Sequence, residues 1–168
     1  MNTYEAILKR RSVRSFSNEQ VTVEEIDLLL KSAMAAPSAC NKQPWEFYVI
    51  KDEKVRNDLS SMNRSKTIIA PLSILVCANI NKSLTTNIDD FWIQDLSAAV
   101  ENILLCAVEL HLSTCWMGVY PVKERVEGIK NYLHLPNNIV PFALIQVGHA
   151  LVDPEPRTQY DEKLVHII

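Results

Sequence analysis

Apolar and polar residues follow two different periods along this chain, and these periods predict helices and strands in turn. After Thr22, which forms a capping-box pattern with Glu25, apolar residues recur at helical spacing until Pro37. Trp45–Ile50 is aromatic and β-branched, which indicates a strand. Pro71–Ala78 is a continuous apolar run of strand length, as expected for a strand covered on both faces.

The same patterns assign most of the chain. Helices are predicted over Asn2–Arg10, Thr22–Met34, Asp52–Met62, Phe91–Leu112 and about Val122–Leu133. Strands are predicted over Trp45–Ile50, Pro71–Ala78, Thr114–Val119 and Val140–Gly148. Two helices followed by alternating strands and helices favour a three-layer α/β/α domain with helices on both faces of a sheet. No linker interrupts the pattern, so we expect one domain over residues 1–168.

The tail from Asp153 begins with prolines and ends in the apolar run Leu164–Ile168. An apolar end of this kind commonly docks on a folded surface. The sequence leaves two surfaces open, the chain's own domain and another subunit.

Composition restricts the class of protein. The 168 residues are 48% apolar and 22% charged with a net charge of −3, so there is no basic field to hold nucleic acid or an anionic membrane. The apolar segment Phe91–Leu112 carries Asp95, Glu101 and Glu109, and we interpret it as a buried helix, not a membrane span.

Cysteine usage and the first residues bear on the compartment. The chain has four cysteines, Cys40, Cys77, Cys106 and Cys115. They show no C-x-x-C spacing, and three of them lie in apolar stretches. Such residues are usually reduced, which suits a reducing compartment. Met1–Arg14 is polar and basic and lacks the apolar core of a signal peptide. We therefore expect a soluble cytoplasmic protein.

A cluster of arginines lies at the end of the first predicted helix. The segment Arg10-Arg11-Ser12-Val13-Arg14 combines planar guanidinium donors with a short hydroxyl, a combination suited to phosphate. A solvated basic turn is the competing interpretation. Nucleic-acid binding is weaker still, because no aromatic residues are interleaved and no further basic surface supports it.

A second segment, Pro37–Trp45, places small and amide residues between two prolines. Small side chains let the backbone approach a flat ligand, and Asn41 and Gln43 offer both donors and acceptors. On its own, this segment is interpreted as a structural connecting loop with a proline stop.

Several familiar sites are missing from the sequence. Three glycines allow neither a G-x-G-x-x-G turn nor a P-loop, so any phosphate must be held by side chains. The four histidines lack metal-ligand spacing, and no G-x-S-x-G elbow is present. We expect neither a metal site nor a hydrolase.

Taken in order, these segments resemble the FMN-dependent nitroreductase family. R-R-S-V-R-S-F and P-S-A-C-N-K-Q-P-W look like its paired signatures, and the likeness continues through Trp116-Met117-Gly118 to Arg157. The resemblance covers nearly the whole chain. It implies an α+β nitroreductase-like fold with a central mixed sheet, and a homodimer in which the C-terminal tail is exchanged with the partner subunit.

The resemblance also implies which residues hold FMN. Arg10, Arg11, Ser12, Arg14 and Arg157 match positions around the phosphate, ribityl chain and pyrimidine edge. A loop laid over the flavin by the other subunit is matched by Pro37, Ser38, Ala39, Asn41 and Gln43. Asn63 and Lys66 resemble a pair at the polar edge of the flavin. Met117 and Gly118 would offer backbone groups near the flavin N5.

The implied reaction moves a hydride from NAD(P)H through flavin N5 to an electron-poor acceptor, a nitroaromatic or a quinone, in a ping-pong cycle. Hydride chemistry belongs to the cofactor, so no side-chain acid, base or nucleophile is expected. Two alternatives stay open: an FMN-binding or storage protein, and a relative with another flavin-dependent reaction. A small domain whose arginines bind an acidic partner is disfavoured by the ordered match.

Overall fold

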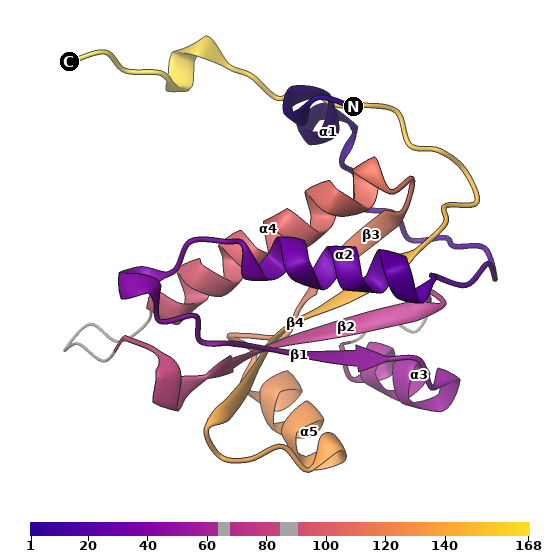
Figure 1. The fold of residues 1–168 in the computed structure, drawn as a ribbon, viewed down its shortest axis with the longest axis vertical. Helices are drawn as coiled ribbons and strands as arrows, with labels where there is room; N and C mark the ends of the chain where they lie inside the picture. The colour runs from indigo at the N-terminus through magenta and orange to yellow at the C-terminus, as the bar shows by residue number, and fades with distance from the viewer. Residues whose placement is uncertain (64–67, 85–90) are drawn as a thin grey trace.

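A four-stranded sheet with helices on both faces organises the molecule, which we describe from a computed structural model (Figure 1). The structure describes residues 1–63, 68–84 and 91–168. The helices are α1 (Thr3–Lys9), α2 (Val23–Met34), α3 (Glu53–Met62), α4 (Phe91–Glu109) and α5 (Lys123–Leu133). The strands are β1 (Trp45–Ile50), β2 (Leu72–Asn79), β3 (Ser113–Gly118) and β4 (Ile139–Gly148). Each lies where the sequence predicts it, with ends shifted by at most a few residues.

The strands follow the order β1-β2-β4-β3, and all three pairings are antiparallel. The expected mixed sheet is therefore wrong for the four named strands, and in the described part of the chain parallel pairing is limited to an isolated bridge between Ser12 and Thr114. The reason lies in the connections. Ile50 at the end of β1 pairs with Ser73 at the start of β2. The connection through α3 therefore returns the chain to the same end of the strands, and β2 runs antiparallel to β1.

Capping side chains fix where the helices begin. The Thr22 side chain accepts a hydrogen bond from the Glu25 backbone N–H at 3.2 Å, and the Glu25 carboxylate accepts one from the Thr22 backbone N–H at 2.8 Å. Asn2 and Glu5 form the same capping box at the start of α1. These reciprocal bonds satisfy donors that the first turn of a helix leaves unpaired, which is why the sequence pattern located the start of α2.

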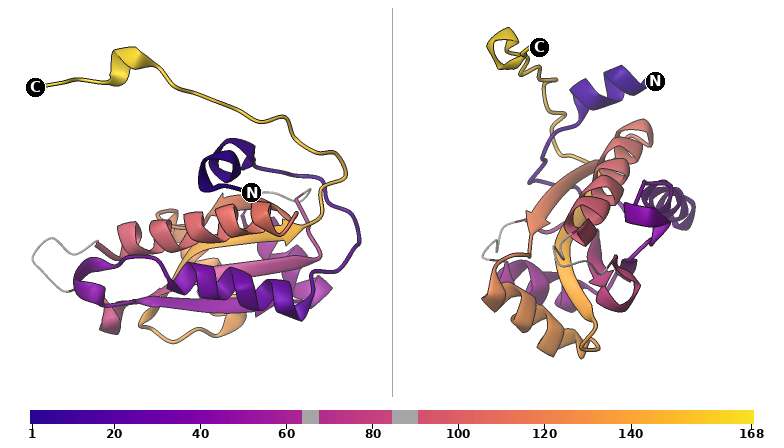
Figure 2. Two further views of the ribbon diagram at one scale, coloured as in Figure 1. Left: turned by 45° about the horizontal axis from the view of Figure 1, so that its top comes forward. Right: turned by 90° about the vertical axis from the view of Figure 1, so that its left-hand side faces the viewer.

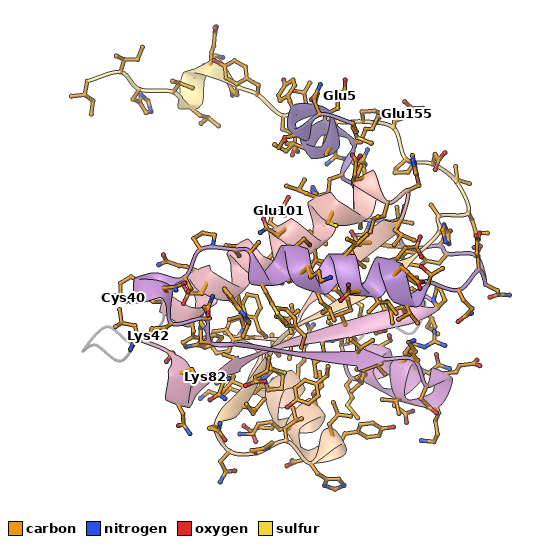
Figure 3. The ribbon with its side chains drawn as sticks, viewed as in Figure 1. Glu5, Cys40, Lys42, Lys82, Glu101 and Glu155 are labelled. Carbon is orange, nitrogen blue, oxygen red and sulfur yellow. The ribbon has the colours of Figure 1, made fainter. Side chains whose placement is uncertain are left out.

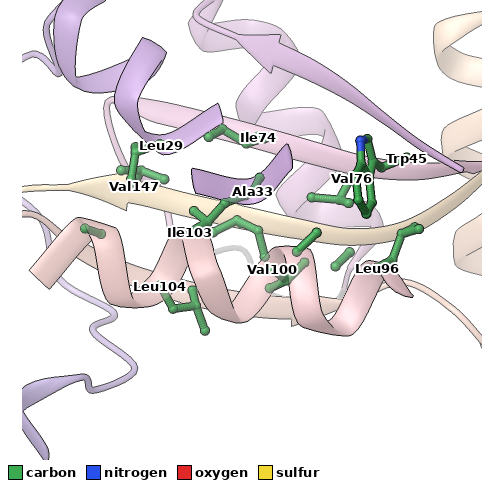
Figure 4. Packing of buried hydrophobic residues seen from close by; sticks show 14 of the residues in the cluster. Leu29, Ala33, Trp45, Ile74, Val76, Leu96, Val100, Ile103, Leu104 and Val147 are labelled. Carbon is green, nitrogen blue, oxygen red and sulfur yellow. The ribbon is translucent and has the colours of Figure 1, made fainter. Parts of the chain in front are cut away.

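The sheet separates two hydrophobic cores because residues of β2 point alternately to its two faces. Ile74 and Val76 pack with α2 and α4, whereas Leu75 and Cys77 pack with α3 and α5. Figure 4 shows the first core from close by, with side chains of α2 and α4 gathered around the sheet. The continuous apolar run of β2 thus reflects a strand buried on both faces, as predicted.

Helix α4 is long and apolar enough to cross a membrane by length and composition. Eight of its residues are nevertheless buried in the protein, among them Leu96, Val100 and Ile103, which are fully inaccessible. The helix packs along α2 and over the sheet (Figure 2). This confirms its prediction as a buried helix.

The two ends of the chain run side by side. The backbone N–H of Leu151 donates to the Ser15 carbonyl and that of Arg157 to the Leu8 carbonyl, both at 3.1 Å. Beyond these contacts the tail extends away from the body (Figures 1 and 2), and its Leu164 and Ile167 side chains are 77% and 97% exposed. In the described structure the apolar end does not dock on its own domain.

Candidate functional site

The segment after α1 lies along the outer edge of β3. The Val13 N–H donates to the Thr114 carbonyl at 2.9 Å, and Ser12 forms a bridge with the same threonine. Because β3 is an edge strand, its outward backbone groups are available for such pairing. Two backbone contacts to one strand fix the position of the neighbouring arginines.

A pocket of about 700 Å³ opens between this segment, α4 and the tail. We call it the arginine pocket. Its walls contain five of the predicted site residues: Arg10, Arg11, Ser12, Arg14 and Arg157. Its size is that of a site for a small molecule or cofactor. Segments from opposite ends of the sequence meet here, so the five residues are brought together as the sequence predicts.

The charges in the arginine pocket favour an anion. Four guanidinium groups face one carboxylate, Glu101, whose Oε1 lies 3.7 Å from Arg10 Nε. Partial burial raises the pKa of the Glu101 carboxyl, and the Arg10 guanidinium opposes this rise. Arg11 donates to the Glu155 carbonyl, and Arg14 Nη1 to the Ser12 carbonyl at 3.4 Å. The excess of planar, charged donors suits a phosphate group.

The loop Pro37–Pro44 takes a tight and unusual backbone path. Its Cys40, Asn41 and Gln43 have positive φ angles of 48°, 52° and 49°, a region that residues other than glycine seldom occupy. The Ser38 hydroxyl accepts a hydrogen bond from the Gln43 N–H at 3.0 Å, and Asp95 Oδ1 on α4 accepts one from the Ala39 N–H at 2.8 Å. These bonds hold the loop in one shape.

This loop lies away from the arginine pocket: Figure 3 labels Cys40 on the loop and, well apart from it, Glu101, which lines the pocket. The loop residues predicted to cover a flavin do not line the arginine pocket of their own chain: Pro37, Ser38, Ala39, Asn41 and Gln43. One chain therefore does not bring the two predicted segments together.

Met117 and Gly118 end β3, and they differ in what their backbone offers. Because Thr114 turns its carbonyl to the outer edge, alternation turns the backbone of Gly118 outward and that of Met117 toward β4, where it pairs with Leu144. The outward Gly118 carbonyl accepts a bond from Arg125 Nη1 at 2.7 Å. Of this predicted pair, only Gly118 directs its backbone N–H to the open edge.

Asn63 closes α3 and is only 5% exposed. Among the described residues, neither Oδ1 nor Nδ2 of its amide has a hydrogen-bond partner. A buried amide without partners is costly, so such a group is suited to a ligand that would supply them. Asn63 does not line the arginine pocket. Its predicted companion Lys66 lies outside the described residues.

Sequence reasoning missed the roles of two acidic residues. Asp95 and Glu101 served only as arguments against a membrane span, yet Asp95 holds the loop Pro37–Pro44 and Glu101 pairs with Arg10. A signal for Asp95 was present: it falls on the apolar stripe between Trp92 and Leu96, and a carboxylate at a buried position needs partners. No comparable signal marked Glu101.

Comparisons with known proteins bear on the same segments. The family model described as "Nitroreductase family" matches residues 7–71 and 61–149. A Methanothermobacter thermautotrophicus protein named "Putative NADH dehydrogenase/NAD(P)H nitroreductase" is 36% identical over 169 residues, covering 99% of this chain and 87% of that protein. An FMN-dependent nitroreductase from Clostridium difficile superposes with a TM-score of 0.86 at 30% identity, with 96% of each chain covered.

A more distant relative is also a reductase by name. An FMN reductase (NADPH) of Bacillus subtilis is 26% identical over 165 residues, covering 88% of this chain and 66% of that protein. The antiparallel sheet, the helices on both faces and the matches along nearly the whole sequence agree with one another. The chain belongs to the nitroreductase family.

Proposed function

We propose that this chain is an FMN-dependent oxidoreductase that takes a hydride from NAD(P)H and delivers it to an electron-poor acceptor such as a nitroaromatic or a quinone. The observation that carries the proposal is the arginine pocket, where four guanidinium groups and Ser12 converge in a member of the nitroreductase family. The names of the relatives, FMN reductase and NAD(P)H nitroreductase among them, support the same cofactor and reductant.

The residues present fit FMN. Arg10, Ser12 and Arg157 would hold the phosphate, and the unpaired buried amide of Asn63 would bond the polar edge of the isoalloxazine ring. Lys66 belongs to this proposal as the partner of Asn63. When bound, FMN supplies the hydride-transfer chemistry, and the protein contributes binding, orientation and charge. No side chain is then needed as acid, base or nucleophile.

The proposed enzyme is a cytoplasmic homodimer, with one FMN-binding domain over residues 1–168 of each subunit. Two observations support the dimer. The loop Pro37–Pro44 lies away from the arginine pocket of its own chain, and the tail leaves Leu164 and Ile167 exposed. A second subunit would bring its loop over the flavin and receive the tail, burying these side chains.

Flavin binding is the first test. Purified protein should carry or take up FMN, recognised by its visible absorbance, and should consume NAD(P)H in the presence of a nitroaromatic or menadione. Initial rates that give parallel reciprocal plots would support alternate binding of reductant and acceptor at one site. Binding without turnover would favour a storage protein, and a colourless protein that takes up no FMN would overturn the proposal.

Variants then test the phosphate assignment. Arg10→Ala should weaken FMN binding about 10- to 100-fold, because a charged hydrogen bond is lost. Ser12→Ala removes a neutral donor and should weaken it only about 2- to 10-fold. Lys9→Ala is the control, since Lys9 is a neighbouring cation that does not line the arginine pocket. Equal FMN affinity in all three variants and the wild type would refute the assignment.

A further inference from the structure

A buried polar network crosses the face of the sheet that carries α3 and α5. Its three side chains, Ser60, Ser73 and Gln146, are fully inaccessible to solvent. They come from α3, β2 and β4. Burying a glutamine side chain in a strand of otherwise apolar residues lowers the stability of the fold unless each of its polar atoms is hydrogen-bonded.

Gln146 bonds through both ends of its amide. Its Oε1 accepts hydrogen bonds from the Ser73 hydroxyl at 3.0 Å and from the Ala70 backbone N–H at 3.2 Å. Its Nε2 donates to the Ser60 hydroxyl at 3.0 Å, and that hydroxyl donates to the Ile68 carbonyl at 3.2 Å. Every described member of the network has a partner, so the arrangement is specified in one form.

The network joins α3 to the chain that enters β2. Ser60 lies one helical turn before Asn63, on the same side of α3. Ile68 and Ala70 lie just before β2, and the network holds both of their backbones. Asn63 is therefore fixed at the end of a helix whose last turn is bonded directly to the centre of the sheet.

We propose that Gln146 is a positioning residue that acts through Ser60 to hold the Asn63 amide in place for the cofactor. The contrast within this short stretch supports the assignment: the network leaves no described polar atom unpaired, whereas the Asn63 amide has no described partner at all. A fully hydrogen-bonded network beside an amide without partners is the arrangement expected when one set of residues positions another for a ligand. This inference rests on the proposed FMN site.

The test measures FMN affinity of the apoprotein by flavin fluorescence in a set of full-length variants. Ser60→Ala and Gln146→Leu should each weaken binding about 10-fold, because either change releases the end of α3. Ser73→Ala is the matched control. It removes a buried hydroxyl from the same glutamine but leaves the bond between Gln146 and Ser60, so FMN affinity should change less than about 2-fold.

A double-mutant cycle separates positioning from general damage. With Asn63→Ala already in place, adding Ser60→Ala should change FMN affinity less than about 2-fold, because the group being positioned is gone. Thermal unfolding of each apoprotein shows that the variants are folded. An effect of Ser60→Ala that is the same with and without Asn63, or an equal effect of Ser73→Ala, would overturn the inference.

The outcomes also distinguish this inference from the proposed function. If Arg10→Ala weakens FMN binding but Asn63→Ala does not, the FMN site stands and the positioning role fails. If the wild-type protein binds no FMN, both are overturned.

Discussion

The two faces of the sheet are built differently. The α2/α4 face is the larger core and is almost entirely apolar, with Asp95 at its margin holding a loop. The α3/α5 face is smaller and has polar groups buried among its apolar residues: Arg56, Ser60, Asn63, Ser73 and Gln146. Apolar burial stabilises without specifying direction, whereas bonded polar groups fix particular atoms. The first face is therefore held chiefly by apolar packing, and on the second face hydrogen bonds fix particular polar atoms in place.

Adjacent core residues on β4 give the largest test of this contrast. Ile145 faces α2 and α4, and Leu144 faces α3 and α5, and both are fully buried. Ile145→Ala and Leu144→Ala should each lower the free energy of unfolding by about 2–5 kcal/mol in urea titrations. Only Leu144→Ala should also weaken FMN binding, because its cavity opens on the face that holds Asn63. Equal losses of FMN affinity would erase the distinction.

Asp95 tests the polar margin of the α2/α4 face. Asp95→Ala leaves the Ala39 N–H without its acceptor and should cost about 1.5–3 kcal/mol in thermal or chemical unfolding. Asp95→Asn keeps an acceptor oxygen and should cost less. If FMN is bound between subunits, Asp95→Ala should weaken its binding as well. A variant as stable as the wild type would show that this contact contributes nothing.

Helix caps should not distinguish the two faces. Thr22 caps α2, and the Asp52 side chain caps α3 by accepting from the Val55 N–H at 2.9 Å. Thr22→Ala and Asp52→Ala should each cost about 1 kcal/mol, measured by urea unfolding. Neither change should alter FMN affinity. An effect of Asp52→Ala on binding would show that the whole of α3, and not only its last turn, positions the cofactor.

The smallest expected effect is a pH-dependent change in Tm when Asp58 is substituted, at the surface where α3 meets α5. Hydrogen bonds from Lys54 at 2.7 Å and Tyr132 at 2.6 Å hold the pKa of the Asp58 carboxyl below its ordinary value. The stabilisation is therefore present above the unfolded pKa of about 4 and is lost as pH falls through the lower folded value. Asp58→Asn should lower Tm slightly near neutral pH, and the difference should vanish in acid. A constant difference across pH would contradict the ion pair.

Local patterns located the elements because their causes are local. The capping box at Thr22 and the continuous apolar run of β2 each depend on residues that are neighbours in sequence, and both lie where predicted. The direction of strand pairing was predicted wrongly because it depends on the path of the connections. Ser60, Ser73 and Gln146 are distant in sequence and become a network only when the sheet forms. The five residues of the arginine pocket were predicted because a family signature records their juxtaposition.

The meeting of the chain's two ends has a consequence for biosynthesis. The arginine pocket is walled by residues 4–14 on one side and residues 157–160 on the other, with a backbone bond from Arg157 to Leu8 between them. A ribosome makes the first wall near the start of translation and the second only after all four strands have been synthesised. A nascent chain therefore carries the arginines of its first wall long before the residues that complete the anion pocket have been made. If the pocket holds FMN as proposed, loading of the cofactor follows translation of Arg157.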